Sequence, residues 1–242
     1  MIYVMSDIHG CFDEFLMMLN KINFSDSDEL YIIGDVVDRG PKPVELLLYI
    51  MKHKNNIHLV KGNHEDMMLN CLIPPHYSDE EKTDYKSSFD LKSNRELWVI
   101  YNGGRTTAKG YNKLTYKEQR DIYYFLEGLK LYQIVEVEDK SYLLLHGGPP
   151  AKWDFSDGSI LTDDVLWTRI ERADFDSDLV PDYHIIVGHT PTVIYGKEYA
   201  GKIIEGYHKY LIDCGCVYGH SLGCLCLNDG SEFYIKRKRL NF

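Results

Sequence analysis

The stretch "YIIGDVVDRGPKP", from Tyr31 to Pro43, places three charged side chains directly after an apolar run. The apolar run is typical of a buried strand. Asp35, Asp38 and Arg39 follow it within a few residues. Because unpaired charge is costly to bury, these side chains must pair with one another or surround a bound cation.

Four other apolar runs also end in polar residues. They are "VMSDIHG", "LVKGNHE", "LLLHGG" and "IIVGHTP". In open α/β sheets the loops beyond the carboxyl ends of the strands converge, and ligands bind there. We therefore expect one site that combines Asp7, His9, Asp35, Asp38, Arg39, Asn63, His64, His146 and His189.

Most of these side chains are potential metal ligands with oxygen or imidazole donors. Such donors suit manganese, iron or zinc. Six of them are too many for one ion that keeps room for a substrate, but they fit two ions that share a carboxylate: Asp7, His9, Asp35, Asn63, His146 and His189. Two-metal sites clamp the attacking and leaving oxygens of an in-line phosphoryl displacement. A single D-x-H or G-N-H-E could cap a helix, but five clusters after five strands favour a site.

The elements that must position these residues alternate in the first third of the chain. The pattern predicts strands at 2–5, 30–34 and 57–62 and helices at 11–22, 43–53 and 64–73. This β-α-β-α-β-α order is typical of a parallel sheet covered by helices. The last part is rich in strands, at 131–137, 141–148, 183–189, 209–215, 223–227 and 232–236. We expect hairpin turns at "NDG", residues 228–230, and within residues 197–206.

The middle of the chain, about residues 74–129, is charged and has helical spacing. Helices are expected in "NRELWVIYNGG" and "TYKEQRDIYYFLEGL". We interpret this segment as a helical insertion in a single catalytic domain that spans residues 1–242.

Composition restricts the partners of the protein. The 242 residues carry a formal net charge of −10, which disfavours binding to nucleic acid. The basic run "KRKRL", residues 236–240, is expected to be a solvated tail. We see no secretory signal and no apolar run of membrane-spanning length, so we expect a cytoplasmic protein without membrane contact. The oligomeric state stays open.

Six cysteines include two C-x-C pairs, Cys214 with Cys216 and Cys224 with Cys226. A zinc site is conceivable at such spacing. Both pairs lie in strand-like stretches, where a free cysteine behaves as a small apolar side chain, and we favour that role. A cytoplasmic protein is not expected to form disulfides.

The motifs "SDIHG", "GDVVDRG" and "GNHE", with the later "HGG" and "GHTP", resemble the signature of the phosphoprotein phosphatases. The resemblance runs from Asp7 to about Cys216 and points to the bacterial and phage lambda-type serine/threonine phosphatases. It implies an α/β fold, the calcineurin-like metallophosphoesterase β-sandwich of mixed sheets flanked by helices. It also implies a hydrolase with two divalent transition metal ions, manganese first, with iron or zinc as alternatives.

The resemblance also implies a role for each matching residue. Asp7 and His9 would hold one metal, Asp35 would bridge, and the other would be held by Asn63, His146 and His189. His64, oriented by Asp38, would protonate the leaving group, while a hydroxide between the metals attacks phosphorus directly. Phosphate would be bound by Arg39, Asn63 and a later arginine, for which Arg169 in "VLWTR" is the candidate.

Two segments depart from the family pattern. Ser6 stands where the first motif normally has glycine, and "IDCGC" replaces I-D-T-G-C. Cys214 thus lies near the site without an evident role, either as an oxidation-sensitive position or as inert packing. Arg105, which follows "NGG", has no role beyond a conceivable substrate contact.

Three functions remain open at this point. The first is a phosphomonoesterase for phosphoserine, phosphothreonine or phosphotyrosine, with a phosphorylated protein or peptide as its partner. The alternative is a symmetrical hydrolase of diadenosine tetraphosphate. A non-catalytic binder of phosphorylated partners is disfavoured, because it needs neither His64 nor Asp38.

Charge favours the first function. A dinucleoside polyphosphate needs cationic partners beyond those of one phosphoryl group. Outside the motifs, the candidates are Arg105, Arg169 and Lys109. We therefore expect phosphopeptides to be turned over with a higher kcat/KM than diadenosine tetraphosphate.

Overall fold

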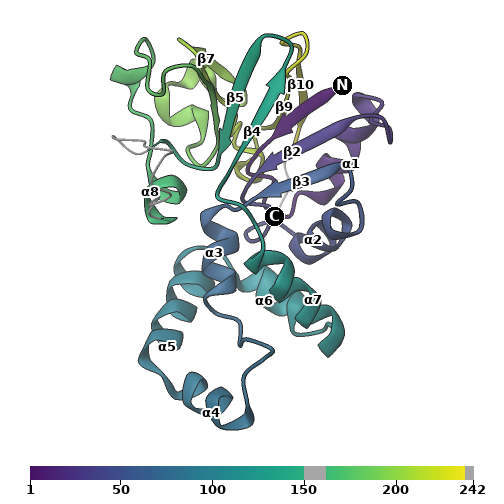
Figure 1. Cartoon of the computed structure of the whole chain (residues 1–242), viewed down its shortest axis with the longest axis vertical. Helices are drawn as coiled ribbons and strands as arrows, with labels where there is room; N and C mark the ends of the chain where they lie inside the picture. Colours follow the sequence, from purple (N-terminus) through teal and green to yellow (C-terminus); the bar gives the residue numbers. More distant parts are fainter. Residues whose placement is uncertain (150–161, 238–242) are drawn as a thin grey trace.

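The computed structural model describes residues 1–149 and 162–237, and two five-stranded mixed sheets form its upper part (Figure 1). The first sheet has the order β10 (Glu232–Lys236), β9 (Ser221–Cys226), β1 (Ile2–Met5), β2 (Glu29–Ile33) and β3 (Ile57–Val60). The second has the order β4 (Tyr132–Val137), β5 (Lys140–Leu145), β6 (His184–Val187), β8 (Lys209–Leu211) and β7 (Ile204–Gly206). The predicted α/β fold with mixed sheets is thus confirmed.

The strands that carry the motifs run in parallel within each sheet. β1, β2 and β3 are parallel neighbours, and so are β5, β6 and β8. The antiparallel strands lie at the margins: β9 pairs with β1, β10 with β9, β4 with β5, and β7 with β8. In each sheet, the carboxyl ends of three parallel strands therefore lie at one edge.

Alternation along each strand builds three layers of core. On β1, Val4 faces the second sheet, whereas Tyr3 and Met5 pack against the helices. On β5, Leu144 points between the sheets, while Leu143 packs on the outer side. Since side chains alternate with a period of two, both faces of each strand must be apolar, which explains the almost unbroken apolar runs.

The helices α1 (Phe12–Lys21) and α2 (Pro43–Lys52) cover the first sheet, and α8 (Thr162–Trp167) packs on the second. α1 buries Phe15 and Met18, which share one face at helical spacing. α2 begins at Pro43, where a proline costs no helical hydrogen bond. α3 (Asn63–Leu69) leads from β3 away from the sheets.

A group of helices forms the lower part of the molecule (Figure 1). It contains α4 (Asp79–Ser87), α5 (Phe89–Glu96), a π-helical segment (Leu97–Tyr101), α6 (Arg105–Tyr111) and α7 (Tyr116–Glu127). α4 and α7 begin with capping boxes, Ser78 with Glu81 and Thr115 with Glu118. The helix α6 has no counterpart in the sequence-based prediction, because its glycine and two threonines are weak helix formers.

Two sequence-based expectations need correction. Residues 197–206 contain a 3₁₀ turn at Lys197–Tyr199 rather than a hairpin turn, and the hairpin joins β7 to β8 through Tyr207 and His208. The basic run is not simply a solvated tail. Lys236 ends β10, and Arg237 donates to the carbonyl of Val217 at 2.9 Å. The rest of the run, residues 238–240, lies outside the described residues.

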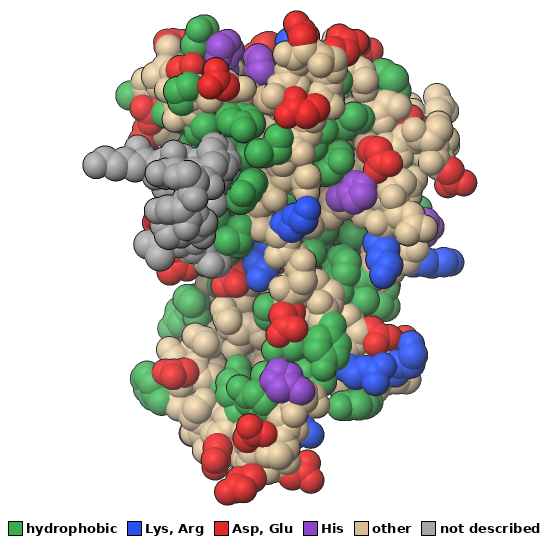
Figure 2. Space-filling view, in the orientation of Figure 1, with side chains coloured by type: hydrophobic (Ala, Val, Ile, Leu, Met, Phe, Trp, Pro, Cys, Tyr) green, Lys and Arg blue, Asp and Glu red, His purple; other side chains and the backbone are tan. Residues whose placement is uncertain are grey.

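The visible surface is strongly charged at both ends, with acidic side chains at the top and bottom and Lys and Arg mostly across the middle (Figure 2). Within residues 1–149 and 162–237, no helix has the length and apolarity to cross a bilayer.

A substitution at Gly34, which follows β2, can test how closely the ends of the strands pack. Its φ is +85°, and a Cβ there would lie 2.6 Å from both Gly62 Cα and His146 Nδ1. Gly34→Ala should lower the free energy of unfolding by about 3 kcal/mol or more, because backbone cannot yield to relieve the collision. Denaturant titration measures the loss.

Gly219→Ala is the matched control, since Gly219 has a φ of +87° but nothing within 4 Å of the place where a Cβ would lie. It carries the backbone strain alone, about 1 kcal/mol. Equal losses in the two variants would show that packing between the strand ends contributes nothing.

Candidate metal centre and catalytic cleft

The ends of the parallel strands bring the predicted site residues together. Each of them lies in the loop that follows its strand or begins the helix after it, as Asn63 and His64 do at the start of α3. Seven of the nine side chains are almost fully buried: Asp7, His9, Asp35, Asp38, Asn63, His64 and His146. The convergence expected from the strand-end pattern is therefore present in the structure.

Asp35 lies at the centre of the cluster. Its carboxylate is 3.4 Å from Nε2 of His9 and 3.3 Å from Nε2 of His146, on opposite oxygens. It also accepts the backbone N–H of His64 at 3.1 Å. One carboxylate thus joins two groups of potential ligands, which is what a bridging ligand requires.

Glu65 holds the loop from which Asp35 projects. Its carboxylate accepts four backbone N–H groups, those of Asp35, Val36, Val37 and Gly62, at 2.7–3.2 Å. The side chain is fully buried. Four hydrogen bonds to one buried carboxylate fix the loop between β2 and α2 against the start of α3.

The histidines are oriented as metal ligands commonly are. Nδ1 of His9 bonds to the carbonyl oxygen of Val37 at 2.8 Å, and Nδ1 of His146 to that of Ile33 at 2.9 Å. Such bonds on one ring nitrogen fix the ring and direct the other nitrogen toward a metal. Nε2 of His64 and of His189 is buried without a hydrogen-bond partner among the described residues. These side chains fit a divalent cation.

The possible ligand atoms form two groups that share Asp35. One contains His9, Asp35 and His64, the other Asp35, His146 and His189, with all ligand atoms within 4.8 Å of one another in each group. Asn63 joins the second group, since its Oδ1 lies 2.8 Å from Nε2 of His146. This arrangement can hold two ions with a common carboxylate.

Asp7 lies beside the second group, where its Oδ2 accepts the backbone N–H of His189 at 2.9 Å. The candidate group around His9 and Asp35 contains His64 and not Asp7, so the assignment of Asp7 as a ligand stays a prediction. The metal content of a His64 variant can separate the role of proton donor from that of ligand.

Backbone strain is concentrated at this site. Ten non-glycine residues in the described ranges have positive φ, and six of them belong to the site: Asp7, His9, Asp35, Asp38, Arg39 and His189. Such conformations cost about 1–3 kcal/mol each and persist where the surroundings fix them. The strained backbone lowers the stability of the fold and orients these side chains toward one another.

Two buried carboxyl groups of the site, Asp7 and Glu65, resist ionisation, whereas Asp35, despite its burial, has a pKa held well below its usual range by the nearby His146 and His64. Burial raises the pKa of Asp7 to about 6, and burial together with the charge of Asp35 raises the pKa of Glu65 to about 7. Burial opposes a proton on His146, but the neighbouring Asp35 carboxylate prevails and raises the pKa of His146 to about 10. Repulsion from the Asp35 carboxylate also contributes to the raised pKa values of Asp7 and Glu65, and a bound cation would relieve it.

Asp38 and His64 form a buried pair. Asp38 Oδ2 lies 2.6 Å from His64 Nδ1 and also accepts the indole N–H of Trp98 at 2.8 Å. Asp38 Oδ1 accepts the hydroxyl of Thr107 at 2.5 Å. Trp98 and Thr107 come from the helices of the lower part, so that part completes the environment of the pair.

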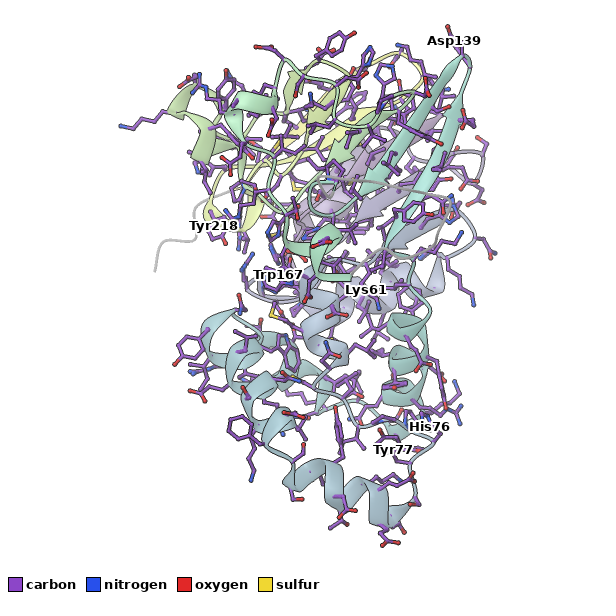
Figure 3. All side chains as sticks on the ribbon, turned by 60° about the vertical axis from the view of Figure 1, so that its left-hand side comes forward. Lys61, His76, Tyr77, Asp139, Trp167 and Tyr218 are labelled. Carbon is purple, nitrogen blue, oxygen red and sulfur yellow. The ribbon has the colours of Figure 1, made fainter. Side chains whose placement is uncertain are left out.

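A cleft of about 350 Å³ opens over the cluster. Its lining contains both predicted arginines, Arg39 and Arg169, together with Asp35, His64 and His189. Trp167 and Tyr218 also line it, and both lie at the level where the sheets meet the helices (Figure 3). The guanidinium of Arg39 lies 5.7 Å from the centre of the Tyr218 ring.

The glycines of "HGG" hold the segment that carries Arg169. The backbone N–H of Gly147 donates to the carbonyl of Val165 at 2.8 Å, and that of Gly148 to Thr168 at 2.6 Å. The end of α8 is thereby fixed beside His146, which directs Trp167 and Arg169 to the cleft.

Other candidates from the sequence lie away from the cleft. Arg105, the first residue of α6, is not among the residues that line it. Cys214 is buried in the core between the sheets, and burial raises the pKa of its thiol well above the usual range. The candidate metal groups in the described residues contain no cysteine, and the six cysteines are unpaired and buried.

Sequence reasoning missed Glu65, Trp98, Thr107 and Asp213 as parts of the site. Asp213 follows β8 and is buried, and burial together with nearby Asp7 raises the pKa of its carboxyl well above the usual range. The end of a sixth strand could have indicated Asp213, and the spacing of "GNHE" could have indicated Glu65. No sequence signal connects Trp98 or Thr107 with Asp38.

The profile of the calcineurin-like phosphoesterase family matches residues 1–224 of this chain. A symmetrical bis(5'-nucleosyl)-tetraphosphatase of Psychromonas ingrahamii is 25% identical, over 98% of this chain and 97% of the relative. One from Actinobacillus pleuropneumoniae serotype 3 is 42% identical over 75% of this chain and 55% of the relative. One from Wigglesworthia glossinidia brevipalpis is 31% identical over 64% of this chain and 47% of the relative. The matches to the last two span about half of those relatives.

Solved structures share the fold at low sequence identity. A crystal structure named provisionally as a diadenosine tetraphosphatase has a TM-score of 0.64 and 18% identity, covering 98% of this chain and 93% of that chain. A metallophosphoesterase from Sphaerobacter thermophilus has a TM-score of 0.54 and 17% identity, covering 98% and 89%. These similarities concern the fold alone.

The names of the relatives overturn one expectation. The charge argument predicts a phosphorylated protein or peptide as the partner, whereas these relatives are named for bis(5'-nucleosyl) tetraphosphates. The argument is wrong because it counts cations along the sequence and leaves out the aromatic side chains of the cleft, which can bind bases without any charge.

The two ligand groups predict two metal ions per chain. After manganese loading and removal of free metal, elemental analysis should give close to two ions for the wild type. Asp35→Asn should bind fewer than one, because both groups lose their shared ligand. Asn63→Ala should keep about one, since Asn63 contacts the second group only.

The variants should keep their folded far-UV circular dichroism, which separates ligand loss from unfolding. A wild-type value of zero or one, reproduced after loading, would rule out two ions. Equal metal loss in both variants would contradict the division into two groups.

Proposed function

This chain belongs to the calcineurin-like phosphoesterase family, and from that premise we propose that it is a symmetrical bis(5'-nucleosyl)-tetraphosphatase. Such a hydrolase cleaves the tetraphosphate bridge at its centre. Water supplies the oxygen, and two nucleoside diphosphates leave. The family supports hydrolysis of a phosphoester in general, and the dinucleotide substrate is the proposed part.

One observation carries the choice of substrate. The relative from Psychromonas ingrahamii, named for this activity, aligns with 98% of this chain and 97% of its own length. An alignment of both chains over nearly their whole length includes the sheets, the site motifs and the helices of the lower part. At 25% identity it motivates the proposal, which activity measurements must test.

The cleft supports the same substrate. Arg39 and Arg169 line it with the ligand cluster, and guanidinium groups bind phosphate oxygens in pairs. Trp167 and Tyr218 are 39% and 56% exposed, so both rings are accessible to a base. Stacking of a base on an aromatic side chain contributes about 1–3 kcal/mol. A substrate with phosphates in the middle and bases at both ends matches this lining.

The residues that would hold two divalent cations are Asp7, His9, Asp35, Asn63, His146 and His189. When bound, the cations would supply Lewis acidity and a nucleophile at neutral pH. The protein holds the ligands in place through the carbonyls of Ile33 and Val37 and through Glu65. Arg39 and Arg169 would bind the nonreacting phosphate oxygens and balance the charge that develops in the transition state.

His64 is the proposed proton donor. Its Nδ1 is held by Asp38 at 2.6 Å, while its Nε2 is buried without a partner among the described residues and the side chain lines the cleft. The carboxylate can fix the tautomer and the orientation of the ring, as a positioned general acid requires. The proton would pass from Nε2 to the oxygen of the leaving diphosphate.

Substrate preference tests the proposal. Bis(5'-adenosyl) tetraphosphate, p-nitrophenyl phosphate and a phosphoserine peptide are compared at one manganese concentration. The dinucleotide should have a kcat/KM at least tenfold above that of the peptide, which corresponds to about 1.4 kcal/mol in transition-state binding. Chromatography should show ADP as the only nucleotide product.

Trp167→Ala is the companion variant. Loss of a stacking surface should raise KM for the dinucleotide and leave p-nitrophenyl phosphate nearly unaffected, because that substrate has no base. Formation of AMP with ATP, or a preference for the peptide, would contradict the proposal.

The role of His64 depends on the leaving group. His64→Asn should reduce kcat for phenyl phosphate by about 10²–10⁴, the usual contribution of a general acid. Phenolate resembles the tyrosine side chain, with a pKa near 10, and needs the proton. p-Nitrophenyl phosphate, with a more acidic leaving group, should lose less.

Metal content controls this experiment. The His64 variant should retain its metal. If it loses metal instead, His64 is a metal ligand and not only a proton donor. Asp38→Asn should show the same dependence on the leaving group, and the double variant should be little worse than either single one, because the two residues act as a unit.

A further inference from the structure

A second cavity, of about 510 Å³, lies among the helices of the lower part. It shares no lining residue with the cleft over the metal ligands. Segments from the loop after α3 and from α4, α5, α6 and α7 surround it. Its volume is in the range of small-molecule sites, about 300–1,000 Å³.

The wall of this helical cavity is largely apolar. Leu72, Leu91 and Trp98 are at least 94% buried and line it, together with Ala108 and Tyr111. The helices around it leave space that their own side chains do not fill. An apolar lining with a few polar groups is typical of sites for organic molecules.

The charged side chains of the cavity all have the same sign. Lys82, Lys86 and Arg95 line it, and among the described residues its lining contains no Asp or Glu. This is unusual in a chain that carries 37 acidic and 27 basic residues. Lys82 lies 3.6 Å from the carboxylate of Asp79 in the first turn of α4, so part of its charge is already balanced. No ion pair with Asp or Glu within 4.0 Å is found for Lys86 or Arg95 among the described residues. Lys86 and Arg95 beside an apolar wall complement an anion with an apolar body.

The cavity also touches the buried pair of the catalytic cleft. Trp98 lines the cavity, and its indole N–H donates to Asp38 Oδ2 at 2.8 Å. The same oxygen lies 2.6 Å from His64 Nδ1. A molecule that displaces the Trp98 ring would therefore change the hydrogen bonding of the oxygen that orients His64.

We propose that the helical cavity is a second binding site, for an organic anion with an aromatic or aliphatic body, and that Trp98 couples its occupancy to the Asp38–His64 pair. The site goes beyond the proposed hydrolysis and does not depend on which phosphoester is the substrate. Lys86 and Arg95 bind the anionic group, and the apolar wall holds the body. Trp98 acts as a positioning residue, because it acts through Asp38.

Binding is measured with two fluorescent probes of similar shape. Anilinonaphthalene sulfonate carries the anion, and N-phenyl-1-naphthylamine is its neutral counterpart. Lys86→Glu with Arg95→Glu should weaken the sulfonate at least tenfold and the neutral probe less than twofold. Lys92→Glu with Lys117→Glu is the control, with a charge change of the same sign on α5 and α7 outside the cavity lining.

A substitution that leaves the charge unchanged tests whether the probes bind in the helical cavity. Ala108 lines the cavity, and Ala108→Phe would occupy part of its volume. This variant should weaken both probes, whereas charge reversal weakens only the anion. Thermal unfolding of every variant confirms that the fold is retained.

Coupling is measured as a change in kcat. Saturating sulfonate probe should change kcat for p-nitrophenyl phosphate at least twofold in the wild type without a matching change in KM. The effect should disappear in Trp98→Phe, which keeps an aromatic ring but lacks the indole N–H. An effect on KM alone would place the probe in the cleft over the metal ligands instead.

Three results would overturn the proposal. If the sulfonate binds the charge-reversed variant and its control with equal affinity, the cationic side chains do not contribute to binding. Unchanged binding by Ala108→Phe would place the probe elsewhere. Binding that follows the cavity with no response of kcat would refute the coupling through Trp98.

Discussion

The geometry of the site depends on the buried carboxylate of Glu65. It accepts backbone N–H groups from both the loop after β2 and the turn before α3. That loop carries Asp35, Asp38 and Arg39, all with positive φ. Without a fixed acceptor, backbone in this conformation would relax to a more favourable region. The carboxylate thus holds in one arrangement the residues proposed to contact the metals, the proton donor and the phosphate.

A second buried carboxylate, that of Asp38, connects the loop after β2 with the helical part of the molecule. Its two oxygens accept from His64, Trp98 and Thr107, residues that come from α3, the π-helical segment and α6. A fully buried carboxylate requires such partners, since each missing hydrogen bond would leave it poorly solvated. The helical part therefore belongs to the environment of the site, and it is connected to His64 through both carboxylate oxygens of Asp38.

Charge connects the site with stability. Burial raises the pKa of Asp7 to about 6 and that of the Asp213 carboxyl well above its usual range. The fold places these groups close together although they repel one another when ionised. Divalent cations would relieve the repulsion, and any ligand that binds only the folded state also stabilises it. Bound cations would thus serve both the stability of the fold and the proposed catalysis.

The sequence by itself determined the strands that position the site and the chemical class of the site, but not every helix, since α6 and α8 were not predicted. Apolar runs that end in Asp, His and Asn predict strands because the side-chain period is a local pattern. In α/β sheets the loops at the carboxyl ends of parallel strands converge, so the polar residues were expected at one site. The hydrogen bonds of Trp98 and Thr107 with Asp38, across 60 and 69 residues, were decided only by tertiary packing. So were the buried position of Asp213, the helical cavity with its three cations, and the two accessible aromatic rings in the cleft. Such features depend on contacts between segments that are distant in the sequence. These contacts form only when the helices pack, and they leave no periodic pattern in the local sequence.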